Sequence, residues 1–261
     1  MVDAPQFAHA PSMDAAQSIR QSLSRVAALR AQVAESAPLQ RTLLATKQFQ
    51  ARRFAGTYQD LLQSSTFVAP TRFFLEELYG ERDFSDRDTQ FARIAGALQT
   101  FFPSQVVATA VALAQLHALT EALDVEMAQC LLSDGGPADP SLDSTRYLRS
   151  WRAVATPAIR LGQLQSVLDI GHELDRLTRT KGLRLTLRMM RGPAKAAGLH
   201  SLQSFLETGF DTFASMGGKG RDAQAFLDTI RERETTWIDA LFHAPRVACE
   251  TDLETCLGKA L

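Results

Sequence analysis

The sequence predicts an all-α protein, a single multi-helix bundle of about nine or ten helices. Apolar residues recur at spacings of three and four through almost all of the 261 residues, which is the period of an amphipathic helix. Alternating runs with β-branched residues between turn signals are nearly absent, so strands are not expected. A hydrophobic content of 45% is sufficient for a sizeable buried core.

Proline, serine and glycine mark the helix boundaries in the first half of the chain. Pro38 and Pro103 stand at helix starts, where a missing N–H is tolerated. Ser85 and Asp88 have the spacing of a capping box, and Gly80 occupies the position of a left-handed helix end. After a flexible start at 1–12, we predict helices over residues 13–36, 38–62, 71–79, 86–101 and 104–132.

The loop SDGGPADPS at 133–141 is the strongest candidate for a hinge. Beyond it, Thr156-Pro157 begins a helix, and Lys181-Gly182 and Gly192-Pro193 end helices. We predict helices over residues 142–154, 157–179, 183–191, 199–216, 222–242 and, more weakly, 252–259. The domain organisation is one helical bundle over 13–245, with a possible hinge at 133–141, and a C-terminal tail over 246–261.

Composition narrows the classes of partner. Lys and Arg total 28 against 29 Asp and Glu, so the whole molecule has no electrostatic attraction to nucleic acid or to an anionic membrane. Nucleic acid is therefore not an expected partner. No secretory leader and no uninterrupted apolar run long enough for a transmembrane segment occur, and the three cysteines include no CxxC pair. We expect a cytoplasmic protein.

The sharpest charge anomaly is a basic run over residues 176–195. It contains seven cations and no acid: Arg176, Arg179, Lys181, Arg184, Arg188, Arg191 and Lys195. On the predicted helix over 183–191, Arg184, Arg188 and Arg191 share one face, away from the face with Leu183, Leu187 and Met190. Three guanidinium groups on one stripe repel one another unless anions lie across from them.

Three interpretations of this stripe compete. In the first, it pairs with acids of the same chain, such as those within 76–88 or 228–239. In the second, it binds an anionic small molecule or an acidic protein partner. In the third, it binds nucleic acid or a membrane, but no aromatic residues are interleaved with the arginines to stack on bases. The leading functional hypothesis is a non-catalytic binding protein. In it, Arg184, Arg188 and Arg191 contact the anionic group while Met189 and Met190 adapt to the apolar part.

The stretch TRFFLEELYGERDFSDRD, residues 71–88, combines aromatic and charged residues. Core packing is the expected use of its aromatic side chains, with a partner or ligand contact as the alternative. Its alternating acids and arginines are typical of a solvated face, and an Arg82–Asp83 pair is expected to lock the turn after Gly80. We interpret the stretch as an aromatic brace whose acids face the basic stripe when the stripe is unoccupied.

A metalloprotein or oxidoreductase is the alternative function, because helical bundles build metal sites from inward-facing His and carboxylate residues. His117 and Glu121 stand four residues apart on one predicted helix, with Asp124 beyond them, and Asp169, His172 and Glu173 lie on another. No Glu-x-x-His motif occurs. No motif fixes a reaction, and no cofactor follows from the sequence, although binding of haem through a single histidine stays open.

Several segments resemble a bacterial family of all-helical proteins of unknown function. They are RFAGTYQDLLQSS at 53–65, RFFLEELYGERDFSDRD with FARI at 72–94, and LRMMRGPAKAAGLHSLQSFLETGF with MGG at 187–218. The resemblance covers about residues 45–245 and implies one helical unit that spans the loop at 133–141. It implies no activity and no catalytic residues. The amphipathic helix over 13–36 lies outside it and makes a homodimer plausible, although it could equally pack on its own chain.

Overall fold

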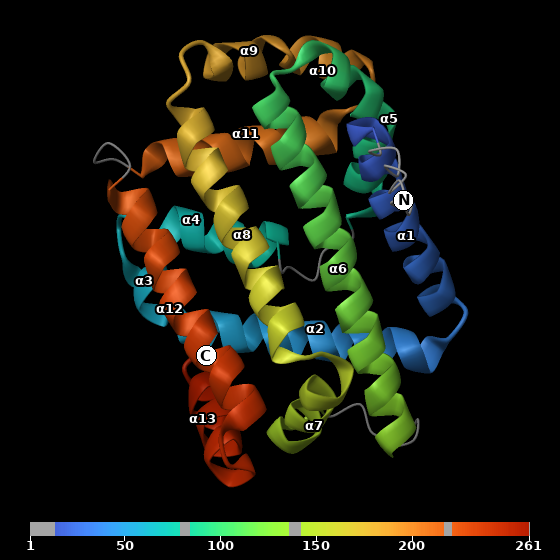
Figure 1. Cartoon of the computed structure of the whole chain (residues 1–261), viewed down its shortest axis with the longest axis vertical. Helices are drawn as coiled ribbons and strands as arrows, with labels where there is room; N and C mark the ends of the chain where they lie inside the picture. Colours follow the sequence, from blue (N-terminus) through green and yellow to red (C-terminus); the bar gives the residue numbers. More distant parts are fainter. Residues whose placement is uncertain (1–13, 79–83, 136–141, 217–220, 261) are drawn as a thin grey trace, which may run out of the picture.

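A computed structural model describes residues 14–78, 84–135, 142–216 and 221–260 (Figure 1). These residues form the α-helices α1 to α13 and one π-helical segment, η1, and they contain no strand. The predicted all-α class is therefore confirmed. The predictions for Gly80, for the Arg82–Asp83 pair and for residues 1–12 and 136–141 fall outside the described residues.

Four long helices lie side by side in one layer. In order across the layer they are α12 (Arg221–His243), α8 (Pro157–Thr178), α6 (Ser104–Gly135) and α1 (Ala15–Ala34). The apolar stripe of α1 is buried against α6 and α5 (Ser85–Phe101) of the same chain, with Ile19 and Val26 inaccessible to solvent. This packing removes the feature that made a dimer through this helix plausible.

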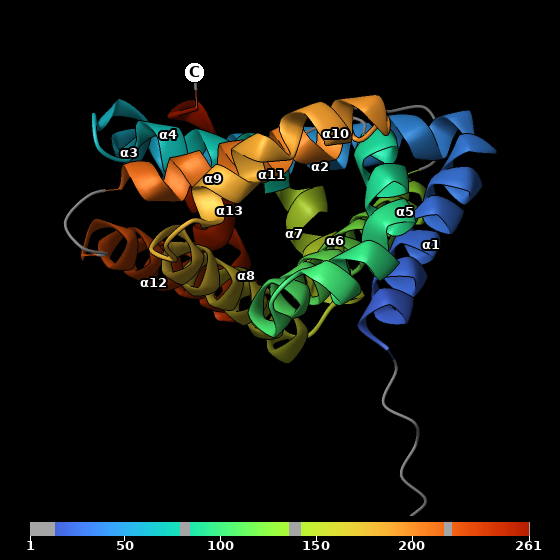
Figure 2. The same ribbon diagram turned by 90° about the horizontal axis from the view of Figure 1, so that it is seen from above.

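A second layer crosses the first. It contains α2 (Ala37–Thr57), α3 (Gln59–Gln63), α4 (Val68–Phe73), η1 (Phe74–Leu78) and α11 (His200–Ser215). Figure 2 shows the two layers edge on, with α11, α4 and α2 on one side and α12, α8 and α6 on the other. The main apolar core lies between the layers, and its buried residues include Phe49, Phe74, Trp151 and Phe226.

The two ends of the bundle are covered by shorter helices. One end carries α9 (Leu183–Met189) and α10 (Arg191–Ala196), and the other carries α7 (Ser144–Val154) and α13 (Arg246–Gly258) (Figure 1). Among these, α9 has no fully buried residue. The end formed by α9 and α10 is thus the more lightly packed of the two.

Most predicted helix boundaries agree with the structure because local capping groups set them. The Ser36 and Thr156 hydroxyls accept hydrogen bonds from the N–H groups of Leu39 and Ile159, and the Asp143 carboxylate accepts one from Arg146 N–H at 2.7 Å. Pro38 and Pro157 follow two of these caps in the first turn of α2 and α8, as predicted.

Several boundaries differ from the predictions. The helix predicted over 71–79 begins at Val68 and continues as the π-helical η1, and the N-cap of α5 is Phe84 rather than Ser85, with no side-chain capping hydrogen bond. The helix predicted over 38–62 is interrupted at Tyr58, which separates α2 from α3. The predicted stop at Gly192-Pro193 is wrong, because Pro193 lies in the first turn of α10, where its missing N–H breaks no helical hydrogen bond. The weak helix predicted over 252–259 begins already at Arg246 and is packed against α2 and α7.

Helix α6 is long and apolar enough, by length and composition, to cross a membrane. The sequence analysis did not single it out, because polar residues interrupt each apolar run. In the bundle α6 contacts α1, α2, α7 and α8, and a core helix of a globular fold has the same composition.

The contact between α2 and α13 is unusually close at Gly56. A Cβ atom at this position would lie 2.0 Å from the carbonyl oxygen of Cys256. The Cys256 thiol also donates a hydrogen bond to the carbonyl oxygen of Arg53, at 3.2 Å. The missing side chain therefore lets α13 pack directly on α2.

Gly56→Ala is predicted to lower the free energy of unfolding by about 2 kcal/mol or more, because the added methyl group forces the two backbones apart. Urea unfolding followed by circular dichroism measures the change. The matched control is Gly162→Ala in α8, where a Cβ atom would meet nothing within 4 Å and where alanine is expected to stabilise the helix by up to about 1 kcal/mol. Equal effects of the two changes would contradict the close contact.

Candidate functional site

An apolar cavity of about 340 Å³ lies between the two layers, beneath α9 and α10. Its walls come from α4, η1, α5, α6, α8, α9, α10, α11 and α12. Among the described lining residues, only Thr109 and Gln203 have polar side chains. Voids larger than a few water molecules are rare in protein interiors, and this volume lies within the range of small-molecule sites.

Two glycines shape the cavity wall. A Cβ atom on Gly209 of α11 would lie 2.9 Å from the ring of Phe73, and one on Gly171 of α8 would lie 2.5 Å from Leu227. Both glycines line the cavity. Without side chains there, α11 packs against the Phe73 ring and α8 approaches α12, so glycine is used here for close approach.

The segment of α9 and α10, residues 183–197, forms a cover over the cavity. Its inner face contributes Leu183, Leu187 and Met190, which are half-buried, and the buried Ala194. Gly182 and Gly198 bracket the cover, and both have positive φ values, of 84° and 67°. The cover buries few side chains and has a glycine at each end. Segments with these two features are the ones that open locally in folded proteins.

Polar contacts hold the cover on the bundle. Arg184 forms an ion pair with Asp211 of α11 at 2.8 Å, and the Arg191 Nε atom lies 2.7 Å from each carboxylate oxygen of Glu207. The Gln203 amide donates a hydrogen bond to the Leu187 carbonyl oxygen at 2.7 Å. The hydrogen bonds from Arg191, and secondarily its charge, lower the pKa of the Glu207 carboxyl. We call these contacts the latch of the cover.

The basic run is mostly neutralised within the chain. Besides the two latch pairs, Arg176 pairs with Glu173 and Arg179 with Asp175. The latch acids lie on α11, outside the two segments, 76–88 and 228–239, considered in the sequence analysis. Within the described part of the chain, Lys181, Arg188 and Lys195 have no carboxylate at ion-pair distance. Met189 points outward and is 70% exposed, whereas Met190 lines the cavity.

The residues of the alternative metal site are not brought together. Glu121 pairs with Lys47 at 2.6 Å, and His117 contacts Asp88 rather than Glu121. On α8, Asp169 accepts a hydrogen bond from Gln165, and Glu173 pairs with Arg176, while His172 stands between them. Among the described residues, no group of three or more His, Cys, Asp or Glu side chains is placed to hold a metal ion.

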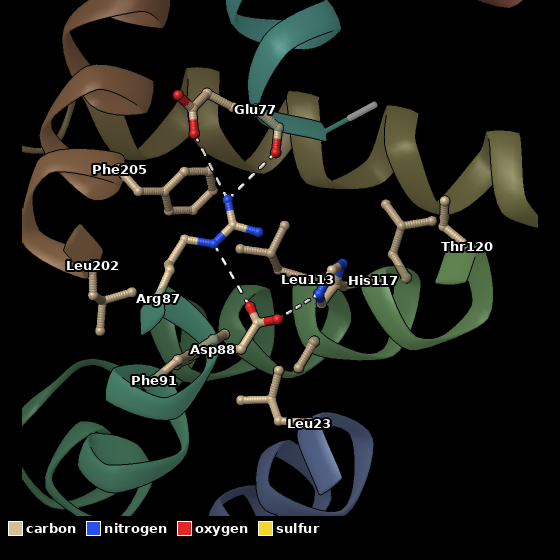
Figure 3. Close-up of a pocket in the computed structure, with 12 residues that line it drawn as sticks. Leu23, Glu77, Arg87, Asp88, Phe91, Leu113, His117, Thr120, Leu202 and Phe205 are labelled. Carbon is tan, nitrogen blue, oxygen red and sulfur yellow. Dashed lines mark hydrogen bonds and ion pairs between the residues drawn. The ribbon is translucent and has the colours of Figure 1, made fainter. Parts of the chain in front are cut away.

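A cluster of partly buried polar groups surrounds the buried Asp88 carboxylate (Figure 3). Its Oδ2 atom lies 2.8 Å from Arg30 of α1 and 2.8 Å from the His117 Nε2 atom of α6. Arg87 lies 3.7 Å from the other oxygen and also donates to the Glu77 carbonyl oxygen of η1. Asp88 therefore joins α1, α5 and α6, and Arg87 extends the cluster to η1.

The surroundings of Asp88 favour its charged form. Burial by itself raises the pKa of the carboxyl, but the hydrogen bond with His117 and the charges of Arg30 and Arg87 together lower it below the ordinary value. The expectation of a solvated face is thus wrong for Asp88, which is 6% exposed. The aromatic prediction for the same stretch is confirmed, because Phe73 and Phe74 are buried.

Asp88→Asn is predicted to destabilise the protein by about 2 kcal/mol at pH 7, because the partly buried Arg30 and Arg87 lose their counter-charge. Urea unfolding across a pH series measures the effect. An aspartate in the unfolded chain has a pKa of about 4. Because the pKa of Asp88 is lowered in the folded protein, its charge stabilises the fold above about pH 4, and this stabilisation is lost as pH falls further. The difference between wild type and variant should therefore shrink below pH 4. Asp239→Asn on the exposed face of α12 is the control, and a similar loss there would contradict the assignment.

The comparisons with known proteins identify a family and no activity. No curated protein and no solved structure matches the chain. A family described as a domain of unknown function, DUF8198, matches residues 29–247, from the end of α1 to the start of α13. This range includes the cavity, its cover and the Asp88 cluster, and it agrees with the expected membership of a family without assigned chemistry. The chain belongs to the DUF8198 family.

Proposed function

We propose that the protein is a non-catalytic binding protein for a small, mainly apolar molecule that occupies the cavity beneath α9 and α10. The observation that carries this proposal is the size and apolar character of the cavity. At 24 cal/mol per Å³, an empty apolar void of this size costs roughly 8 kcal/mol, which is comparable with the whole stability of a typical domain. A molecule that fills the cavity restores that packing.

The cavity lining supports binding rather than catalysis. Its two polar side chains, Thr109 and Gln203, are not titratable, and the Gln203 amide is already bonded to Leu187 and Glu207. General acid–base catalysis needs a titratable group within hydrogen-bond reach of the reacting atoms. The volume equals about eleven molecules of liquid water, so the buried part of the ligand contains on the order of ten non-hydrogen atoms.

The outer face of α9 supports a second candidate, an acidic protein partner. Leu185 is 62% exposed and Met189 is 70% exposed, next to Arg188, which has no ion pair in the described part of the chain. An apolar surface beside an unneutralised cation fits a partner with acidic and apolar residues. Because Arg184 and Arg191 already hold carboxylates, the internal cavity is the stronger basis for a function.

Ala110→Phe is predicted to weaken binding of 1-decanol at least tenfold, because the ring fills the cavity from the α6 wall. Calorimetric titration of the purified full chain measures the affinity. Ala108→Phe on the exposed side of the same helix is the matched control and should leave the affinity unchanged. If wild-type protein binds neither 1-decanol nor decanoate, the proposed function is wrong.

Replacing both latch arginines, Arg184→Gln with Arg191→Gln, is predicted to raise the rates of 1-decanol binding and release several-fold, with little change in affinity. Loss of the ion pairs to α11 lets the cover open more often. Stopped-flow tryptophan fluorescence measures both rates. Arg188→Gln removes one charge from the same helix without removing an ion pair, and it should leave the rates unchanged. An equal acceleration in this control would contradict the role of the latch.

A further inference from the structure

A small polar chamber lies within the bundle, separate from the apolar cavity. Its volume is about 40 Å³, which equals about one molecule of liquid water on the scale of about 30 Å³ per molecule. Four buried charged residues line it: Arg53, Asp124, Arg160 and Glu234. The other polar side chains of its wall are Tyr147 and Trp151 of α7 together with Gln50, Thr120 and Gln163. Ionisable groups are seldom buried together unless they are paired or used.

Part of this charge is paired internally. The Arg53 Nη1 atom donates to both oxygens of Glu234, at 2.7 and 2.8 Å, and the Tyr58 hydroxyl donates to the same carboxylate at 2.8 Å. The guanidinium group of Arg160 stacks on the Trp151 ring at 3.8 Å and donates to the Gln163 amide oxygen. Glu234 is therefore fully engaged by Arg53 and Tyr58.

The Tyr147 hydroxyl, Trp151 Nε1 and Arg53 Nε are buried polar atoms of the wall that have no hydrogen-bond partner among the described residues. The nitrogens of tryptophan and arginine can only donate. A buried donor without a partner destabilises the folded state. Burial raises the pKa of Tyr147 to about 12, and the charges of Arg53 and Arg160 act against that rise, so this hydroxyl lies among the charged groups. The missing partner is a hydrogen-bond acceptor.

The chamber and the apolar cavity follow one another along the same helix faces. On α8, Leu164 lines the chamber and Val167, one turn further on, lines the cavity. On α12, Glu234 and Ile230 are related in the same way. Phe74 of the π-helical segment η1 lines both spaces and forms part of the partition between them. A π-helical turn often marks a functional position.

We propose that the ligand of the cavity is a monocarboxylic acid with an apolar chain, and that its carboxylate occupies the polar chamber beyond Phe74. This inference rests on the proposed function. In this position the carboxylate accepts hydrogen bonds from Trp151, Tyr147 and Arg53. The chain then extends past Phe74 into the apolar cavity.

Charge balance makes this binding sensitive to pH. The positive charges of Arg53 and Arg160 balance the negative charges of Glu234 and Asp124, and Lys47 balances the neighbouring Glu121. A bound carboxylate therefore gives this region a net charge of about −1. Burial raises the pKa of Asp124 to about 6, and a further anion raises it again, so Asp124 takes up a proton from solvent on binding. Affinity for the ionised ligand should fall by up to about tenfold per pH unit between pH 6.5 and 8.

The experiment compares decanoate with 1-decanol, which has the same chain and no charge. Calorimetric titration of the full chain at pH 7 should give at least tenfold tighter binding of decanoate. Tyr147→Phe and Trp151→Phe should each reduce that preference by about tenfold and leave 1-decanol unaffected. Neither change removes a hydrogen bond within the described protein, so both variants are expected to fold.

Two controls make the outcome decisive. Ser150 is on the same helix and has a buried hydroxyl without a hydrogen-bond partner in the described residues, but it does not line the chamber. Ser150→Ala should therefore leave the affinities for decanoate and 1-decanol unchanged. Asp124→Asn should abolish the dependence of decanoate affinity on pH. If decanoate binds no better than 1-decanol, the chamber holds only water and the inference fails while the proposed function stands. If neither probe binds, the proposed function itself fails.

Discussion

The buried ion pair of Arg53 and Glu234 is the interaction on which the interior of this bundle depends. It joins α2 of one layer to α12 of the other, across 181 residues of sequence, with the Tyr58 hydroxyl on the same carboxylate. Arg53 is also stacked on the Phe54 ring, at 3.8 Å. Neither partner can leave without stranding a charge in the interior, so the pair fixes the separation of the two layers where the polar chamber lies.

The space between the layers changes character along its length. Near the ion pair it is small, polar and surrounded by long, well-packed helices, whereas beneath α9 and α10 it is large and apolar. In the proposed function, the first part recognises one chemical group through fixed donors, and the second holds an apolar chain of suitable size. Exposed ion pairs contribute little stability individually, so under the proposed function the cover they hold would open for ligand exchange without unfolding of the bundle.

The Asp88 cluster has a different part in the structure. Its ion pairs and hydrogen bonds connect α1, α5 and α6. Phe91, Leu113 and Phe205 form a wall between this cluster and the apolar cavity, because they line the space on each side. Arg87 stacks on Phe84 and on Phe205, at 4.0 and 4.6 Å, so its charge is spread over aromatic faces while its donors reach Glu77 and Asp88. This cluster supports one wall of the cavity and takes no part in the proposed recognition.

The sequence by itself determined the helical class, most helix boundaries and the burial of Phe73 and Phe74, because periodicity and capping are local properties of the chain. It also located the basic run, but it could not supply the partners of Arg184 and Arg191, which lie on α11. Only the tertiary structure decided that His117 meets Asp88 rather than Glu121, and that Tyr147 and Trp151 face Arg53 and Arg160. Such pairings depend on how helices that are distant in the sequence pack against one another, and this packing produces no periodic pattern in the sequence from which the pairs could be predicted.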